Sequence, residues 1–210
     1  AEQSIKDYIE RNPILKTKTM HLNGNYSIDS EVGNELYNLF GEYKNVYLYF
    51  DGNKTERHIE EYKKTIDAID EIVKTIRKHN LSPLEEIMYA YDLVREKVYT
   101  RELDTESDRI SRDLSSVLFG DKIVCAGYVA IFNSVLKNLG ISVMDYKLIK
   151  KENNKKGHVR SLVYVKDKKY HVNGVFMFDP TWDSKKCEGD KSYLRSYKFF
   201  CKSKMQVPSL

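Results

Sequence analysis

Apolar residues between positions 123 and 141 recur at steps of three and four, the spacing that predicts a helix. The main apolar face consists of Val129, Phe132, Leu136 and Leu139. A second face adds Ile131 and Val135, which leaves only the polar strip Asn133, Ser134, Lys137 and Asn138. A helix that is apolar over most of its circumference is a buried one. We therefore predict a buried central helix that Gly140 ends and whose N-terminus carries Cys125.

Two more helices are predicted before this one. Residues 55–79 again alternate steps of three and four, at Ile59, Tyr62, Ile66, Ile69, Val73 and Ile76. Over about three heptads this spacing fits a coiled-coil seam or, as we favour, one amphipathic helix packed on a core. The next helix begins at Ser82-Pro83-Leu84-Glu85, a cap followed by a proline and an acidic third position, and runs to about Val98. Its expected inward residues are Leu84, Ile87, Met88, Tyr91 and Val98.

The pattern changes from helical to extended after Gly140. Strands are predicted at residues 141–149, 159–165, 169–172 and 175–178, with turns at 150–157, at Asp167-Lys168 and at Asn173-Gly174. Helices over residues 55–139 followed by antiparallel strands over 141–179 predict an α+β domain.

The remaining segments give weaker patterns. Residues 1–50 predict short helices at 2–11 and 30–43 and strands at 14–22 and 46–50. The charged residues 100–113 predict a loop, and 114–119 form a short apolar piece that leads into the central helix.

Composition limits the class of protein. With 41% hydrophobic and 31% charged residues, the chain is expected to be globular, and no apolar run approaches the length of a membrane span. A net charge of +4, spread among 31 acidic residues, does not indicate a nucleic-acid partner. The first residues do not form a signal peptide, but the chain does not begin with Met. We therefore expect a chain that is either cytoplasmic or secreted with its signal removed; its oligomeric state is not predicted.

The chain has three cysteines, too few for a disulfide scaffold. Cys187 and Cys201 could pair in an oxidising compartment, or both could equally remain thiols; either way one cysteine is left over. The backbone N–H groups and partial positive charge at a helix N-terminus favour thiolate over thiol. Ala126 and Gly127 are small, so a substrate has room to approach the backbone there. A lone cysteine is most often a buried structural thiol, and only residues further along the chain change that expectation for Cys125.

Two downstream motifs supply the groups that thiolate catalysis needs. Gly157-His158 opens one predicted strand, and Asp179-Pro180-Thr181-Trp182-Asp183 ends another. A cysteine nucleophile works with a histidine that accepts and returns its proton, and with a carboxylate or amide that orients the histidine. A histidine at the start of one strand can lie beside an aspartate at the end of an antiparallel neighbour.

Together, these motifs resemble the transglutaminase-like superfamily, in particular its bacterial-type transglutaminase-like or cysteine peptidase domains. The resemblance is carried by Val124-Cys125-Ala126-Gly127-Tyr128, Leu139-Gly140-Ile141, Gly157-His158 and Phe178-Asp179-Pro180-Thr181-Trp182-Asp183, within roughly residues 82–183. It implies a papain-like α+β core, in which N-terminal helices and a central Cys-bearing helix pack on an antiparallel sheet. It also implies a Cys-His-Asp triad acting on amide bonds, with Cys125 as nucleophile, His158 as general base and acid, and Asp179 as orienting carboxylate.

The chain departs from the family pattern in two places. The family histidine is often followed by Ala-Trp-Asn, whereas this chain has Val159-Arg160-Ser161. Tyr170-His171-Val172-Asn173 resembles the segment that normally leads into the catalytic aspartate, so Asn173 is an alternative orienting residue. We favour Asp179, because the Pro-Thr-Trp continuation belongs with it.

Several further residues are candidates around the predicted site. The Cys125 backbone N–H is expected to be one oxyanion donor, and the side chain of Tyr99, or else Tyr89, the second. Trp182 is either core or a wall of the substrate cleft. The histidines His21, His58, His79 and His171 lack ligand-like spacing, so no metal and no cofactor is predicted. The lysines of a basic turn near His158 are a solvated turn or a rim for acidic or peptide substrates; they are Lys147, Lys150, Lys151, Lys155 and Lys156.

The sequence thus predicts an N-terminal extension of unknown role at residues 1–54 and a catalytic domain at 55–210. We expect Cys125 to attack a peptide or glutamine carboxamide bond and to form a thioester that water hydrolyses, as in a peptidase or deamidase. The first alternative is protein cross-linking by amine transfer, and the second is a non-catalytic binding module of the same fold. The expected partner is a protein or peptide substrate.

Overall fold

Helix α8 (Cys125–Asn138) forms where the central helix is predicted, and its residues from Ala126 to Leu136 are all buried. The structure is a computed structural model, which describes residues 56–100, 114–120, 123–148 and 157–203. The helix ends as predicted. Gly140 has a φ of +80°, and the Ile141 N–H donates to the Leu136 carbonyl, the pairing of a glycine-terminated helix.

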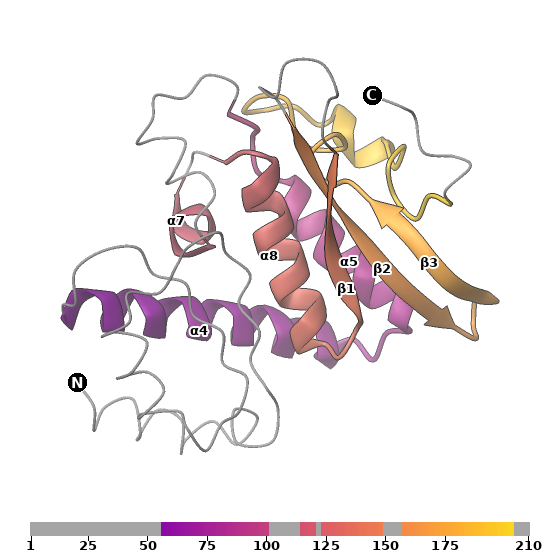
Figure 1. Ribbon diagram of the computed structural model, residues 1–210, viewed down its shortest axis with the longest axis horizontal. Helices are drawn as coiled ribbons and strands as arrows, with labels where there is room; N and C mark the ends of the chain where they lie inside the picture. Colours follow the sequence, from indigo (N-terminus) through magenta and orange to yellow (C-terminus); the bar gives the residue numbers. More distant parts are fainter. Residues whose placement is uncertain (1–55, 101–113, 121–122, 149–156, 204–210) are drawn as a thin grey trace.

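Helix α4 (Glu56–Lys78) agrees with the predicted amphipathic helix. Its described apolar residues Ile69, Val73 and Ile76 are buried in the main core. The helix contacts α7 (Leu114–Phe119), α8 and α5 (Pro83–Arg95) within the same chain. Figure 1 shows it lying across the lower ends of α5 and α8. It is therefore a packed helix of this domain rather than a coiled-coil strand.

Helix α5 begins as predicted but ends earlier, at Arg95 instead of near Val98. Its N-terminus is capped from within and from a distant strand: the Ser82 N–H donates to Glu85 Oε2, and the Asp167 carboxylate accepts the Leu84 N–H. One expected inward residue is wrong, because Met88 is exposed. The buried residues of α5 are Ile87, Ala90, Tyr91, Val94 and Arg95.

Three antiparallel strands form one sheet in the order β1-β2-β3. They are β1 (Val143–Leu148), β2 (His158–Asp167) and β3 (Val172–Phe178). The predicted turn at Asn173-Gly174 is wrong, because both residues pair with β2 inside a single strand β3. The chain instead turns at residues 168–171, where the Asp167 carboxylate accepts the Tyr170 N–H and His171 has a φ of +55°.

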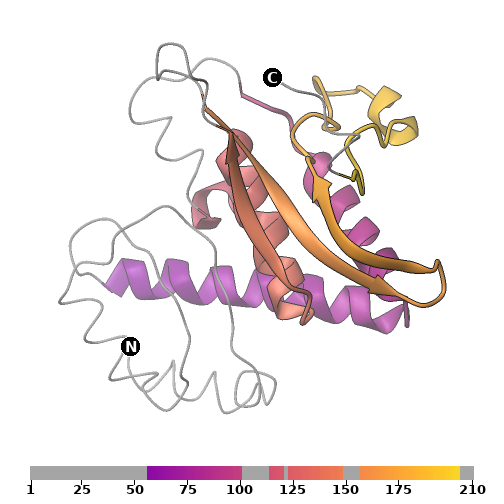
Figure 2. The same ribbon diagram turned by 45° about the vertical axis from the view of Figure 1, so that its right-hand side comes forward.

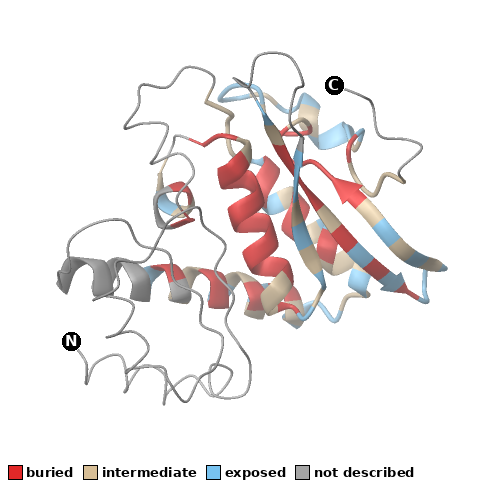
Figure 3. Cartoon of the chain, in the orientation of Figure 1, coloured by how far each residue is buried: buried red, intermediate tan, exposed pale blue. Residues whose placement is uncertain are grey.

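The sheet packs one face against α8 and α5 (Figure 2). Alternate β2 residues Val163 and Val165 enter the core, as the two-residue period of a strand requires. Two residues of the predicted polar strip of α8, Asn133 and Ser134, are also buried. Asn133 meets the sheet, where its side chain donates to Asp145 and accepts from Ser161. Figure 3 shows the buried residues concentrated on α8 and the strand faces beside it. The domain is therefore α+β.

A C-terminal segment, residues 179–203, closes one end of the domain and is tied to β3. It contains the short 3-10 helix η1 (Ser192–Arg195). Lys202 pairs with Met177 through two backbone hydrogen bonds of 2.8 and 2.9 Å, and the Asp179 N–H donates to the Phe199 carbonyl. The return of the chain thus holds the residue after β3 in place.

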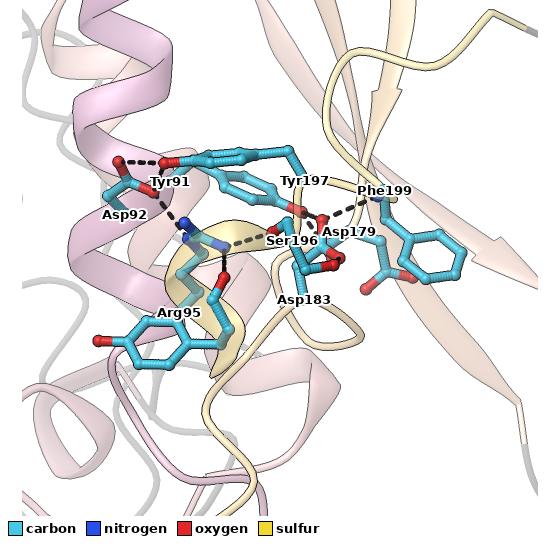
Figure 4. Close-up of polar contacts among 9 residues, drawn as sticks. Tyr91, Asp92, Arg95, Asp179, Asp183, Ser196, Tyr197 and Phe199 are labelled. Carbon is cyan, nitrogen blue, oxygen red and sulfur yellow. Dashed lines mark hydrogen bonds and ion pairs between the residues drawn. The ribbon is translucent and has the colours of Figure 1, made fainter. Parts of the chain in front are cut away.

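Helix α5 anchors the same segment through buried polar side chains (Figure 4). The Asp183 carboxylate lies 2.7 Å from the Tyr91 hydroxyl and 2.8 Å from the Phe199 N–H. Burial, together with Asp183, raises the pKa of Tyr91 well above its usual value, so its hydroxyl remains a donor. Arg95 donates to the carbonyls of Tyr193 and Ser196, both at 2.6 Å. This network fixes the position of the segment that carries Asp179.

Some predicted elements lie outside the described residues. They are the helices and strands of residues 1–50, the loop at 101–113, and the lysine-rich turn from Lys150 to Lys156. The short apolar piece at residues 114–119 is described, and it is the helix α7. The proposed boundary between residues 54 and 55 stays a prediction.

We expect Tyr91→Phe to lower the free energy of unfolding by about 1–3 kcal/mol, because it leaves a buried carboxylate without one of its donors. The matched control is Tyr164→Phe, whose hydroxyl donates to Asn173 at an exposed position. This control should change stability by less than about 0.5 kcal/mol. Urea unfolding of both variants checks the prediction, and equal losses would contradict the anchoring role of Tyr91.

Candidate active site

Cys125 is the first residue of α8 and is partly buried. The preceding Val124 is extended, with φ −114° and ψ 178°, so the chain enters the helix from a bridge between Ile123 and Tyr99. Ala126 and Gly127, in the first helical turn, are buried. The thiol is thus at the positive end of a buried helix, with small residues following it.

His158 and Asp179 lie in contact at one end of the sheet. His158 is the first residue of β2, and Asp179 follows the last residue of β3. The imidazole Nε2 lies 2.6 Å from Asp179 Oδ2, and the aspartate side chain is fully buried. The other carboxylate oxygen, Oδ1, accepts the Trp182 N–H at 3.4 Å. Because Nε2 is engaged by the carboxylate, Nδ1 is the nitrogen left to face the thiol.

The Cys125 thiol is in hydrogen-bonding contact with the His158 side chain. Burial by itself lowers the pKa of this imidazole, but the hydrogen bonds and negative charge of Asp179 and Cys125 outweigh it and raise the pKa to about 9. The imidazolium form is therefore favoured near neutral pH. A protonated histidine between a carboxylate and a sulfur is the arrangement that an ion-paired thiolate needs.

Trp182 is a wall of the cavity at this site. Its ring stacks on the His158 imidazole with a centroid distance of 5.1 Å and an interplanar angle of 18°. It also packs edge to face with the Phe199 ring, at a centroid distance of 4.8 Å. A cavity of about 220 Å³ opens here, lined by Tyr99, His158, Thr181, Trp182 and Lys186. A cavity beside the imidazole gives a small molecule access to His158.

The other candidate residues from the sequence have different positions in the structure. Asn173 lies in β3 opposite Lys166, and its side chain accepts a hydrogen bond from Tyr164. Tyr89 packs against His79 at 5.3 Å, whereas Tyr99 lines the cavity. Lys147 is exposed at the end of β1. Of the two tyrosines, Tyr99 is the one that lines the cavity beside His158.

Sequence reasoning missed three residues at the site. Arg160 is fully buried and its Nε lies 2.8 Å from Asp179 Oδ2. Lys186 and Thr181 line the cavity, and the Thr181 hydroxyl is buried without a hydrogen-bond partner among the described residues. The departure Val159-Arg160-Ser161 from the family pattern was the one signal pointing at Arg160. Nothing in the pattern singled out Lys186.

None of the three cysteines is in a disulfide in the structure; Cys187 is exposed and Cys201 is partly buried. Burial raises the pKa of the Cys201 thiol. Among the described residues there is no group of three or more His, Cys, Asp or Glu side chains arranged to hold a metal ion. In the same part of the chain, no helix has the length and apolar character needed to cross a membrane.

No protein-family model matches the chain, and no curated protein matches it. One similar solved structure is described as "Crystal structure of a TGase". It is 17% identical, with a TM-score of 0.47, over 79% of this chain and 42% of that one. The chain thus corresponds to less than half of that protein's length. The function proposed below therefore rests on the side-chain geometry and the sequence motifs.

We expect the stability of the fold to fall as His158 loses its proton. Its pKa rises from 6.5 to about 9 on folding, so its contribution is fully present below pH 6.5 and lost as the pH passes about 9. The loss should be on the order of 1–3 kcal/mol. Urea unfolding of Cys125→Ser at several pH values measures the part of this loss that Asp179 causes, without titration of the Cys125 thiol. Because Cys125 also raises the His158 pKa, the fall in this variant should begin above pH 6.5 and end below about pH 9.

The control for this measurement is the double variant Cys125→Ser, His158→Gln, which keeps every other titrating group. Its stability should lack the fall that Cys125→Ser shows above pH 6.5. If the two proteins showed parallel pH profiles, His158 would not be held as an imidazolium in the folded state.

Proposed function

We propose that this protein is a cysteine hydrolase of the transglutaminase-like, papain-like kind, acting on peptide or glutamine carboxamide bonds. The observation that carries the proposal is a His158 imidazole held between the buried Asp179 carboxylate and the Cys125 thiol. The thiol is also at the N-terminus of a buried helix. These features favour the thiolate–imidazolium pair that a cysteine nucleophile requires.

In the proposed reaction the Cys125 thiolate attacks the carbonyl carbon of the substrate. As the tetrahedral intermediate collapses, the C–N bond breaks and the His158 imidazolium gives its proton to the leaving amine or ammonia. Water then attacks the thioester, its proton passes to His158, and the Cys125 thiolate leaves. The net change is hydrolysis of the amide to a carboxylic acid and an amine.

Two donors are proposed for the negative oxygen of the intermediate. One is the Cys125 backbone N–H at the start of α8, where helical N–H groups lack helical acceptors. The other is the Tyr99 hydroxyl, supported by the position of Tyr99 in the wall of the cavity. Gly127 keeps the first turn of the helix free of side-chain bulk, and Trp182 forms the wall beside the imidazole.

Water and an amine are alternative acceptors for the same thioester. Incubation with glutamine-containing peptides and a labelled primary amine separates them: ammonia release without label in the peptide indicates hydrolysis, and label incorporation indicates cross-linking. Cys125→Ala is the control for both products. If neither product formed and Cys125 were unreactive, the remaining hypothesis would be a binding module of this fold.

We expect iodoacetamide to alkylate Cys125 at mildly acidic pH, because its thiolate is stabilised by the imidazolium. The exposed free Cys187 is an internal reference thiol in the same molecule. In His158→Ala the pH needed for half-maximal alkylation should rise by about 2 units. Mass spectrometry of the two cysteine peptides gives both rates, and a Cys125 rate no faster than that of Cys187 would refute the proposal.

We expect Asp179→Asn to slow acid-pH alkylation of Cys125 by about 10-fold or more, because the carboxylate that stabilises the imidazolium is gone. The matched control is Asn173→Ala, a change in an exposed strand residue whose side chain accepts a hydrogen bond from Tyr164. This control should alkylate at the wild-type rate. The reverse order would transfer the orienting role to Asn173.

A further inference from the structure

Arg160 is a buried positive charge placed directly on the carboxylate of the site. It follows His158 by two residues along β2, so the two side chains leave the strand on the same face. Arg160 Nε lies 2.8 Å from Asp179 Oδ2, and His158 Nε2 lies 2.6 Å from the same oxygen. A guanidinium and an imidazole therefore share one carboxylate oxygen.

Trp182 connects the two cations a second time. The guanidinium carbon of Arg160 lies 4.5 Å from the centre of the Trp182 ring, while the His158 ring stacks on the same side chain at 5.1 Å. A planar guanidinium stacks on an aromatic face more readily than an ammonium does. The Arg160 charge is thus held in a fixed place relative to both Asp179 and His158.

Arg160 makes few hydrogen bonds for a buried charge. Its Nε, Nη1 and Nη2 make no hydrogen bond to the described residues, so its contact with Asp179 is an ion pair whose N–H is not directed at the oxygen. The other fully buried arginine, Arg95, donates to two carbonyls and to Asp92. Burying a charge with so few hydrogen bonds opposes folding. Because its ion-pair partner is Asp179, the Arg160 charge acts on the same carboxylate that holds His158.

We propose that Arg160 is a positioning residue. Its permanent positive charge competes with the His158 imidazolium for the Asp179 carboxylate and so weakens the hold of that carboxylate on the His158 proton. The inference rests on the proposed function, in which His158 must give this proton to the leaving group. A carboxylate paired with the imidazolium alone would bind the proton more strongly and slow its release.

The charges around His158 come from every element that meets it. The titratable or charged side chains that the structure places near it are Cys125 from α8, Asp179 after β3 and Arg160 from β2, with Lys186 and the neutral Tyr99 lining the same cavity. Asp179 is in direct contact with both cations, and both cations share one of its oxygens. Loss of the Arg160 charge therefore acts on His158 both by removing a repulsion and by freeing the carboxylate.

The test is an NMR titration of the His158 imidazole in the Cys125→Ser protein, with Arg160, Arg160→Gln or Arg160→Lys. Arg160→Gln should raise the titration midpoint by about one pH unit or more, since one charge is removed at close range. Arg160→Lys keeps the charge and should shift the midpoint by less than about half of that. An unchanged or lowered midpoint in Arg160→Gln overturns the proposal.

Arg160→Met is the second variant, because it removes the charge with less change in volume. Both neutral variants should fold at about pH 6, where a protonated His158 balances Asp179. If neither folds there, Arg160 serves the fold and the proposal is overturned. The titration needs no enzymatic activity, so an unreactive Cys125 would refute the proposed function while leaving the effect of Arg160 on His158 measurable.

Discussion

Two buried carboxylates, four residues apart in one turn, impose the main constraint on this fold. Asp179 and Asp183 are both excluded from solvent, and a buried negative charge is tolerated only with compensating partners. Asp183 is compensated by neutral donors, among them the Tyr91 hydroxyl and the Phe199 N–H. Asp179 instead meets two cationic side chains. The same turn therefore contains one carboxylate for anchoring and one for an imidazole.

The arrangement separates structural and chemical roles. Helix α5 holds the C-terminal segment, residues 179–203, through Tyr91 and through Arg95, which donates to two backbone carbonyls of that segment. The segment can then present Asp179 to the end of β2 without depending on its charge for attachment. Substitutions at the anchors should act on stability, whereas substitutions at Asp179 should act on the protonation of His158.

Much of the fold could be predicted from the sequence, because its helices are amphipathic or mostly apolar and have clear ends. Gly140 ended the central helix for a local reason, its positive φ, and Ser82-Pro83 marked the start of α5. The strand Val172–Phe178 was divided wrongly at Asn173-Gly174, because a dipeptide typical of turns was paired by its neighbour β2. Pairing of this kind depends on residues distant in sequence, so a local pattern does not contain it.

For the candidate site, the sequence by itself determined which residue types stand at a helix start and at two strand ends, and hence the hypothesis of a thiol, an imidazole and a carboxylate. Only the tertiary structure decided their distances, their burial and their further neighbours. Arg160 belongs to the second group: in a strand its position looks like any charged surface residue. Trp182 of the C-terminal segment packs on it, and the side chain is buried as a partner of Asp179. Burial of this kind comes from packing between distant segments, so the local sequence does not contain it.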